Sequence, residues 1–263
     1  FGQVLKEGII EDTRNRDALA RLLRFSSTHG DGEAQSVSLE DYAGRMKEGQ
    51  DKIYYITAEN HATAANSPHL EVFRDKGIEV LLLTDRVDEW VVMHLNEFDG
   101  KALQSVAKGE VDLGTLDGKD GDDAKDKDES ADKAENSPEL ESLIGALEKA
   151  LGDRVKAVRS TSRLTSSPAC LVVDEHEMGA HMERILREVG QDVAGSKPIL
   201  EINPGHPIVK HLEAEPDEAR RDDWAAILFD QAVLSEGGRV DDPAGFVRRV
   251  NEMFLAQAGV TAA

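Results

Sequence analysis

Apolar residues in the first hundred positions follow two different spacings. In NRDALARLLRF, residues 15–25, leucines recur at the spacing of one helix face, which predicts a helix. In SLEDYAGRM, Ser38 comes three residues before Asp41, the pattern of a capping box at the start of a helix. The runs KIYYIT and IEVLLLT are instead short and continuously apolar, as in strands that are buried on both faces.

Strands and helices then alternate. The pattern predicts strand 52–57, helix 67–76, strand 78–84, helix 86–98 and strand 101–106. Because this alternation is typical of a mostly parallel sheet covered by helices on both faces, we expect an αβα layered subdomain at 51–108. A helical segment at 1–50 precedes it.

An acidic segment interrupts this order. Between Gly109 and Glu135 there are 11 acidic residues against 4 lysines, and apolar side chains are few. Such a segment cannot bury enough apolar surface to offset the entropy that is lost on ordering. We therefore expect a flexible linker at 109–137, with one folded unit at 1–108 and a second at 138–258.

The segment after the linker has a different element order. PELESLIGALEKALG begins at Pro138 and places its leucines on one helix face. The pattern then predicts RVKAVRSTSRL and SPACLVVDE as antiparallel neighbouring strands, followed by helix 176–189, strand KPILEINP, helix HPIVKHLEAE and two closing helices joined by GGRVD. This order favours an α+β domain that ends in a helical hairpin.

The charge balance excludes several kinds of partner. The 263 residues include 52 acidic and 31 basic ones, a formal net charge of -21, whereas nucleic acids and anionic membranes attract basic patches. The single cysteine, Cys170, permits no internal disulfide, and no apolar run is long enough to span a bilayer. We expect a cytoplasmic protein that binds neither nucleic acid nor membrane. The start at Phe1, without an initiator methionine, is expected for a piece of a longer protein.

The order strand, helix, strand also occurs in nucleotide-binding sheets, but the required loop is missing. Such a sheet feeds a glycine-rich turn whose backbone amides bind the pyrophosphate. The turn after KIYYIT supplies Ala58, Glu59 and Asn60 instead, and the turn after IEVLLLT supplies Asp85. Both turns place a carboxylate where an anion would bind, which disfavours a nucleotide site.

Histidine and cysteine spacing gives no reactive centre either. His176 and His181 are five residues apart, about 140° around a helix, whereas two helical zinc ligands need a spacing of four. Apolar neighbours disfavour a nucleophilic role for Cys170. We therefore predict no catalytic residue, no cofactor and no metal ligand in this chain.

Two sets of helical apolar residues suggest partners instead. Helix 176–189 carries a narrow apolar stripe that includes two methionines, and it either packs on its own sheet or offers an adaptable surface to a flexible partner. The closing helices, at 224–234 and 246–254, carry more apolar surface than two helices can cover. Pairing of two such hairpins into a four-helix bundle predicts a homodimer.

Five separated blocks resemble one family. LLRFSSTHGD, SLEDYAGRMKEGQDKIYYIT, GIEVLLLTDRVDEW, VKAVRSTSRLTSSPACLVV and ILEINPGHPIVKHL are similar, in this order, to the ninety-kilodalton heat-shock chaperones of the bacterial HtpG-like type. The resemblance runs from Phe1 to about Leu255, outside the acidic linker. It implies the end of the middle domain followed by the C-terminal dimerisation domain, with a 51–108 subdomain that binds no nucleotide. ATP and magnesium are then expected only in the full-length parent, which would be an ATPase.

The resemblance also assigns residues to two surfaces. The client-contact residues would be Glu89, Trp90, Met93, Met178, Met182, Ile185 and Leu186. The dimer-interface residues would be Trp224, Ile227, Leu228, Val233, Leu234, Phe246, Val247, Val250, Met253 and Phe254. For Trp90 this reverses the core position that spacing alone favours, and Met93 stands where the family has a polar residue. The chain ends VTAA, without the acidic pentapeptide by which eukaryotic cytosolic members recruit co-chaperones.

Taken together, these patterns predict a fragment of a molecular chaperone. We expect it to form a homodimer, to bind unfolded or partly folded client proteins and to have no enzymatic activity of its own. Two alternatives stay open: a purely structural dimerisation module without a client surface, and a nucleotide-dependent α/β enzyme. Protection of a model substrate from aggregation would distinguish the first, and nucleotide calorimetry the second.

Overall fold

The computed structural model describes residues 2–30, 32–111, 113, 137–193 and 195–257. The chain divides into two compact units. Unit 1 comprises Phe1–Ala134 and Val173–Ser196, and unit 2 comprises Glu135–Val172 and Lys197–Ala263. The sequence predicts one boundary, in the acidic segment. In the structure, by contrast, the segment 173–196 groups with unit 1, although it follows the first strands of unit 2.

Most of the predicted linker, 109–137, lies outside the described residues. Its first residues belong to unit 1: the Gly109 N–H donates to the Val173 carbonyl at 2.9 Å, and Val111 and Leu113 pack in an apolar cluster. The folded part of unit 1 therefore extends beyond the predicted end at 108, because these two apolar side chains find a place in its core.

Unit 1 is built around a mixed sheet. Its elements are α1 (Gly2–Glu11), α2 (Arg16–Leu22), β1 (Ser26–Ser27), α3 (Leu39–Gly44), β2 (Lys52–Thr57), α4 (His61–Ala65), η1 (Pro68–Leu70), α5 (Glu71–Asp75), β3 (Leu81–Leu83), α6 (Asp88–His94), β4 (Glu97–Phe98), β5 (Lys101–Ser105) and α8 (Ala180–Glu188). The strand order is β1-β3-β2-β5-β4. The three central strands are parallel, and β1 and β4 pair antiparallel at the edges.

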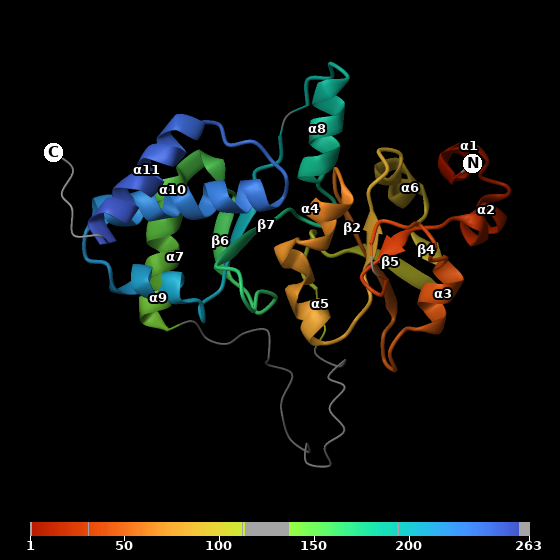
Figure 1. Ribbon diagram of the computed structural model, residues 1–263, viewed down its shortest axis with the longest axis horizontal. Coiled ribbons are helices and arrows are strands. Elements are labelled where there is room, and N and C mark those ends of the chain that lie inside the picture. Colours follow the sequence, from red (N-terminus) through yellow and green to blue (C-terminus); the bar gives the residue numbers. More distant parts are fainter. Residues whose placement is uncertain (1, 31, 112, 114–136, 194, 258–263) are drawn as a thin grey trace, which may run out of the picture. The chain divides into compact units, whose positions relative to one another are not determined.

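Both faces of this sheet are buried, as the alternation along β2 illustrates. Ile53 and Tyr55 join one apolar cluster, which includes residues of α1, α2, α3 and α6. Tyr54 and Ile56 join the other, which includes residues of α4 and α5. Figure 1 shows α4 and α5 on one side of the strands and α3 and α6 on the other. The capping box expected at Ser38 is present.

Two predicted helices of unit 1 are shorter in the structure. Ser67 caps a 3-10 turn with Pro68 in its first turn, so that the predicted helix 67–76 becomes η1 followed by α5. The predicted helix 86–98 ends at His94, because Asp99 and Gly100, both at positive φ, turn the chain from β4 into β5. Neither turn has an apolar spacing that would reveal it.

Unit 2 has helices and a three-stranded sheet. Its elements are α7 (Pro138–Leu151), η2 (Gly152–Arg154), β6 (Ala157–Ser160), β7 (Ala169–Val172), β8 (Ile199–Ile202), α9 (Pro207–Ala214), α10 (Glu218–Ser235) and α11 (Pro243–Gln257). The prediction that the first two strands are neighbours is wrong. The order is β6-β8-β7, with β8 parallel to β6 and antiparallel to β7. All four residues of β8 are buried, and so are all four of β7, so burial alone does not decide which strand is central.

The core of unit 2 lies on one face of this sheet. It combines the leucine stripe of α7 with apolar residues of the three strands, α9 and α10. On the opposite face Cys170 is buried and forms no disulfide. The Glu201 carboxylate, also buried there, is paired with Arg159 at 2.6 Å and with Arg163 at 2.8 Å. Among the described side chains of α11, no apolar one belongs to the buried core.

Candidate functional site

Helix α6 carries the first three predicted client-contact residues, and they differ in exposure. Met93 is 62% exposed and Trp90 is half-buried, whereas Glu89 is only 5% exposed. Because residues three apart lie on the same side of a helix, Trp90 and Met93 form one small apolar surface. Glu89 is four residues before Met93 and so lies near this side of the helix, but its side chain is buried and pairs with His181.

A lysine of α1 forms ion pairs at the first turn of α6. The Lys6 ammonium is buried and lies 2.7 Å from the Asp85 carboxylate and 2.8 Å from the Asp88 carboxylate. The other Asp88 oxygen accepts the Asp85 backbone N–H at 3.0 Å. Burial raises the pKa of Asp88 despite the opposing effect of Lys6. For Asp85, burial is outweighed by the hydrogen bond and charge of Lys6, so its pKa is lowered.

Among the described contacts, three side chains of α8 reach other elements of the same unit. His181 Nδ1 lies 2.8 Å from Glu89 Oε1, and both side chains are nearly buried. Arg184 pairs with Glu59 at 3.3 Å. Arg86, just before α6, pairs with Glu188 at 2.8 Å. These contacts connect both ends of α8 to α6 and to the loop that follows β2.

The apolar stripe of α8 is covered in the structure. Met182 and Ile185 are 7% and 5% exposed, and Met178 and Leu186 are half-buried. Neither Met182 nor Ile185 belongs to the apolar clusters that form the cores. The predicted helix 176–189 begins only at Ala180, because Gly179 is its extended N-cap. The stripe is therefore covered, but the described ion pairs between α8 and other elements go to α6, to Arg86 just before it and to the loop after β2, and not to the sheet of unit 2 on which packing was expected.

The docking of α8 depends on few strong contacts. Arg184 with Glu59 and Arg86 with Glu188 are solvent-accessible pairs, of a kind worth up to about 1 kcal/mol each. The contact between His181 and Glu89 is the buried one. Sequence reasoning missed His181 and Lys6, because their partners lie 92 and 79 positions away and no local spacing connects them.

The predicted dimer residues of α10 divide into an inner and an outer set. Ile227 and Leu228 are buried in their own unit, and Leu228 belongs to the apolar core. Trp224 and Val233 are partly buried against that core, and Leu234 is exposed. For Ile227 and Leu228 the expected accessibility is wrong, because the chain itself already covers them.

Helix α11 presents the other predicted dimer residues to the surface. Val247 and Phe254 are 54% and 66% exposed, and Phe246, Val250 and Met253 are half-buried. Leu255, which was not predicted, is exposed beside Phe254. With Leu234 of α10, these residues leave unit 2 with a sizeable apolar surface. Surfaces of this kind on folded proteins commonly mark interaction sites.

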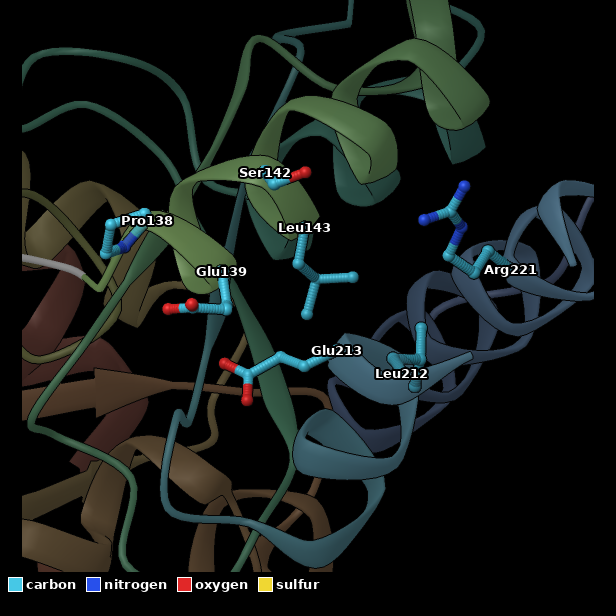
Figure 2. A pocket seen from close by; sticks show the side chains of 7 residues that line it. All are labelled: Pro138, Glu139, Ser142, Leu143, Leu212, Glu213 and Arg221. Carbon is cyan, nitrogen blue, oxygen red and sulfur yellow. The ribbon is translucent and has the colours of Figure 1, made fainter. Parts of the chain in front are cut away.

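A cavity of about 300 Å³ opens in unit 2 between α7, α9 and α10. Figure 2 shows Leu143 and Leu212 between the carboxylates of Glu139 and Glu213 on one side and the Arg221 guanidinium on the other. Arg221 Nε is buried and has no hydrogen-bond partner among the described residues.

The described part of the chain supports neither a metal site nor a membrane-spanning helix. No group of three or more histidine, cysteine, aspartate or glutamate side chains is placed there to hold a metal ion. His206 is the N-cap of α9, where its Nδ1 accepts the Ile208 N–H at 3.1 Å. Within the described residues, none of the helices combines the length and the apolar character needed to cross a membrane.

Comparison with known proteins gives one consistent result. A family model described as Hsp90 protein matches residues 1–263. The chaperone protein HtpG of Chromobacterium violaceum is 60% identical over 255 residues, which cover 97% of this chain and 39% of that protein. The chaperone protein HtpG of Aromatoleum aromaticum is 59% identical over 259 residues, 98% of this chain and 38% of that protein. The chain thus spans about two fifths of the length of these curated relatives.

Proposed function

Since the chain belongs to the Hsp90 protein family, we propose that it contributes client binding and self-association to a larger chaperone. In this proposal residues 1–108 correspond to the end of the middle domain, and residues 138–258 to the C-terminal dimerisation domain. The relatives that share its sequence carry the name chaperone protein HtpG. A chaperone of this kind acts on partly folded proteins in the cytoplasm, where neither nucleic acid nor membrane is a required partner.

The exposed apolar face of α11 is the observation that carries this proposal. Val247, Phe254 and Leu255 lie in a helix that adds no described apolar side chain to the buried core. A closed pair of identical hairpins would cover this face, because each supplies the same residues to the other. The half-buried Phe246, Val250 and Met253 would complete the interface.

Client binding is proposed at the surface of α6. Trp90 and Met93 offer an aromatic and a soft, adaptable side chain, which suits partners of varied shape. Met178, Met182, Ile185 and Leu186 join this surface only when α8 leaves its docked position. The buried state of the α8 stripe is the observation that favours the alternative function, a dimerisation module without a client surface.

The proposal assigns no catalysis to this chain. ATP and magnesium would be bound by a part of the whole protein that this sequence does not contain, and no residue here is proposed to contact them. Isothermal calorimetry with ATP and magnesium tests this directly. Binding with a dissociation constant in the micromolar range would support the nucleotide-dependent alternative instead.

Two measurements test the main proposal. Light scattering at micromolar concentration should give the mass of a dimer, and a monomer would overturn the proposed self-association. The chain should also slow the aggregation of a thermally unfolded model enzyme, and Trp90→Ser should weaken this effect while leaving the circular dichroism unchanged. A dimer that does not slow aggregation would identify the purely structural module.

A further inference from the structure

The face of unit 1 under α8 has a defined charge pattern. Glu89 and Glu59 present carboxylates to His181 and Arg184, and Arg86 presents a guanidinium to Glu188. The order of charges along the surface is therefore acidic, acidic, basic from the first turn of α8 to its last. This order complements the side chains of Arg184 and Glu188 of α8, and it complements His181 when that imidazole is protonated.

The helix periodicity explains how one short helix satisfies all three positions. His181, Arg184 and Glu188 are spaced i, i+3 and i+7, so they form one row along α8. Ile185 lies about 40° from His181 around the helix, next to this row. When the row of His181, Arg184 and Glu188 contacts the face of unit 1, the neighbouring apolar residues of α8 therefore lie next to that face.

We propose that this face, formed by Glu59, Arg86 and Glu89, is a receptor for short amphipathic helices and that α8 is its resident occupant. The partner it fits is a client helix with cationic residues at i and i+3, apolar residues at i+1 and i+4, and an acidic residue at i+7. This inference rests on the proposed function and names the kind of client segment that the surface takes. Trp90 and Met93 on α6 lie close in sequence to Glu89 and extend the contact.

The exposed ion pairs of α8 oppose its exchange with a client helix only weakly. Of the three described ion pairs between α8 and other elements of unit 1, two are solvent-accessible, and such pairs contribute little to stability. The stripe residues Met182 and Ile185 belong to no core cluster of the described chain. While α8 occupies the face, an external helix cannot bind there. The apparent affinity for that helix is therefore its intrinsic affinity multiplied by the fraction of molecules whose face is free.

The probe for this test is a synthetic peptide with the sequence of residues 179–190, added to the intact chain. A release variant carries His181→Ala and Arg184→Ala, which remove two docking contacts from its own α8 but leave the receptor face unchanged. Its affinity for the peptide should exceed that of the unmodified chain by at least about tenfold. The matched control is Arg187→Ala, whose ion pair is with Glu183 of the same helix, and its affinity should stay unchanged.

A charge exchange makes the result specific. Glu59→Lys in the release variant should weaken binding of the peptide, and a peptide with Arg184→Glu should restore it. Equal binding of a scrambled peptide, or equal affinity of the release and control variants, would overturn the inference. Failure to slow client aggregation, with peptide binding as expected, would instead count against the proposed function alone. The opposite pair of results would leave the chaperone proposal standing and remove this receptor.

Discussion

Helices α8 and α11 are both amphipathic, and the sequence predicts a partner surface on each, yet their apolar faces end in different surroundings. Met182 and Ile185 of α8 are almost fully covered, whereas Val247 and Phe254 of α11 are more than half exposed. The difference lies in the charged residues beside each stripe. His181, Arg184 and Glu188 find partners on unit 1. The described ion pairs of α11 run within the helix or to α10.

This contrast shows what amphipathic periodicity decides. It identifies which face of a helix avoids water, but a neighbour in the same chain and a second molecule satisfy that face equally well. Here the choice depends on charges that are distant in sequence. Surfaces that the chain covers by itself should therefore respond differently to substitution and to dilution from surfaces that it leaves to a partner.

The largest effect is expected where the predicted interface turned out to be core. Leu228→Ala removes a buried side chain from unit 2 and should lower the free energy of unfolding by about 3 kcal/mol, within the range known for such cavities. Leu234→Ala, at an exposed position of the same helix, should cost less than about 1 kcal/mol. Urea denaturation followed by circular dichroism measures both. Similar losses would mean that the division of α10 into an inner and an outer face is wrong.

Self-association should depend on the α11 face. The double substitution Val247→Asp and Phe254→Asp places two carboxylates in the proposed interface and should raise the dissociation constant of the dimer by about 100-fold or more. Sedimentation equilibrium measures this change. Val4→Asp is the matched control, because Val4 is an equally exposed valine in α1, outside both proposed surfaces. An unchanged dimer in the double variant would exclude α11 from the interface.

Parts of this architecture could be predicted from sequence because their determinants are local. The capping box at Ser38, the leucine stripe of α7 and the apolar runs of β2 and β8 each act within a few residues. The order β6-β8-β7 could not be predicted, because β7 and β8 are both largely apolar and both fully buried, so their pattern does not tell which one is central. Residues 173–196 group with unit 1 through contacts with Gly109 and Glu89, which are distant in the sequence.

The candidate surfaces show the same limit. The apolar face of α11 follows from the spacing, whereas the Trp90–Met93 surface follows from the family resemblance alone. The burial of Glu89, Ile227 and Leu228 does not, since a periodic apolar face is compatible with either environment. Lys6 gave no signal at all, because a lysine in an amphipathic helix is normally solvated and only its distant carboxylate partners explain its burial.

Hydrogen exchange should distinguish the two helices by their response to dilution. If α11 is covered by a second copy, its amides should exchange about tenfold faster when the chain is diluted below the dissociation constant of the dimer. The amides of Ala180–Glu188 should change by less than about twofold, because unit 1 of the same chain holds α8. Mass spectrometry of the exchanged peptides reports both segments in one experiment. Concentration-dependent exchange in α8 would show that it, too, is covered by a partner.

The smallest effect uses a tyrosine as a reporter for the α8 side of the comparison. Burial raises the pKa of Tyr42 and of Tyr55 well above the ordinary value, and the nearby Glu89 charge adds to the increase for Tyr55. In the unfolded chain these two tyrosines ionise near pH 10, whereas in the folded chain they stay protonated at that pH. Their contribution to the stability of the fold is therefore fully present below pH 10 and is lost as the pH rises. Each of the two tyrosines should thus cost about 1.4 kcal/mol of stability between pH 9 and pH 11.

Glu89→Gln removes the charge that faces Tyr55, so it should lower the pKa of Tyr55 and leave that of Tyr42 unchanged. Carbon-13 resonances of the labelled tyrosine rings follow the two groups separately. The Val247→Asp and Phe254→Asp variant should leave both pKa values unchanged, since α11 belongs to unit 2. A shift of Tyr42 in place of Tyr55 would contradict the position of Glu89, whose carboxylate acts on Tyr55 and lies 2.8 Å from His181 of α8.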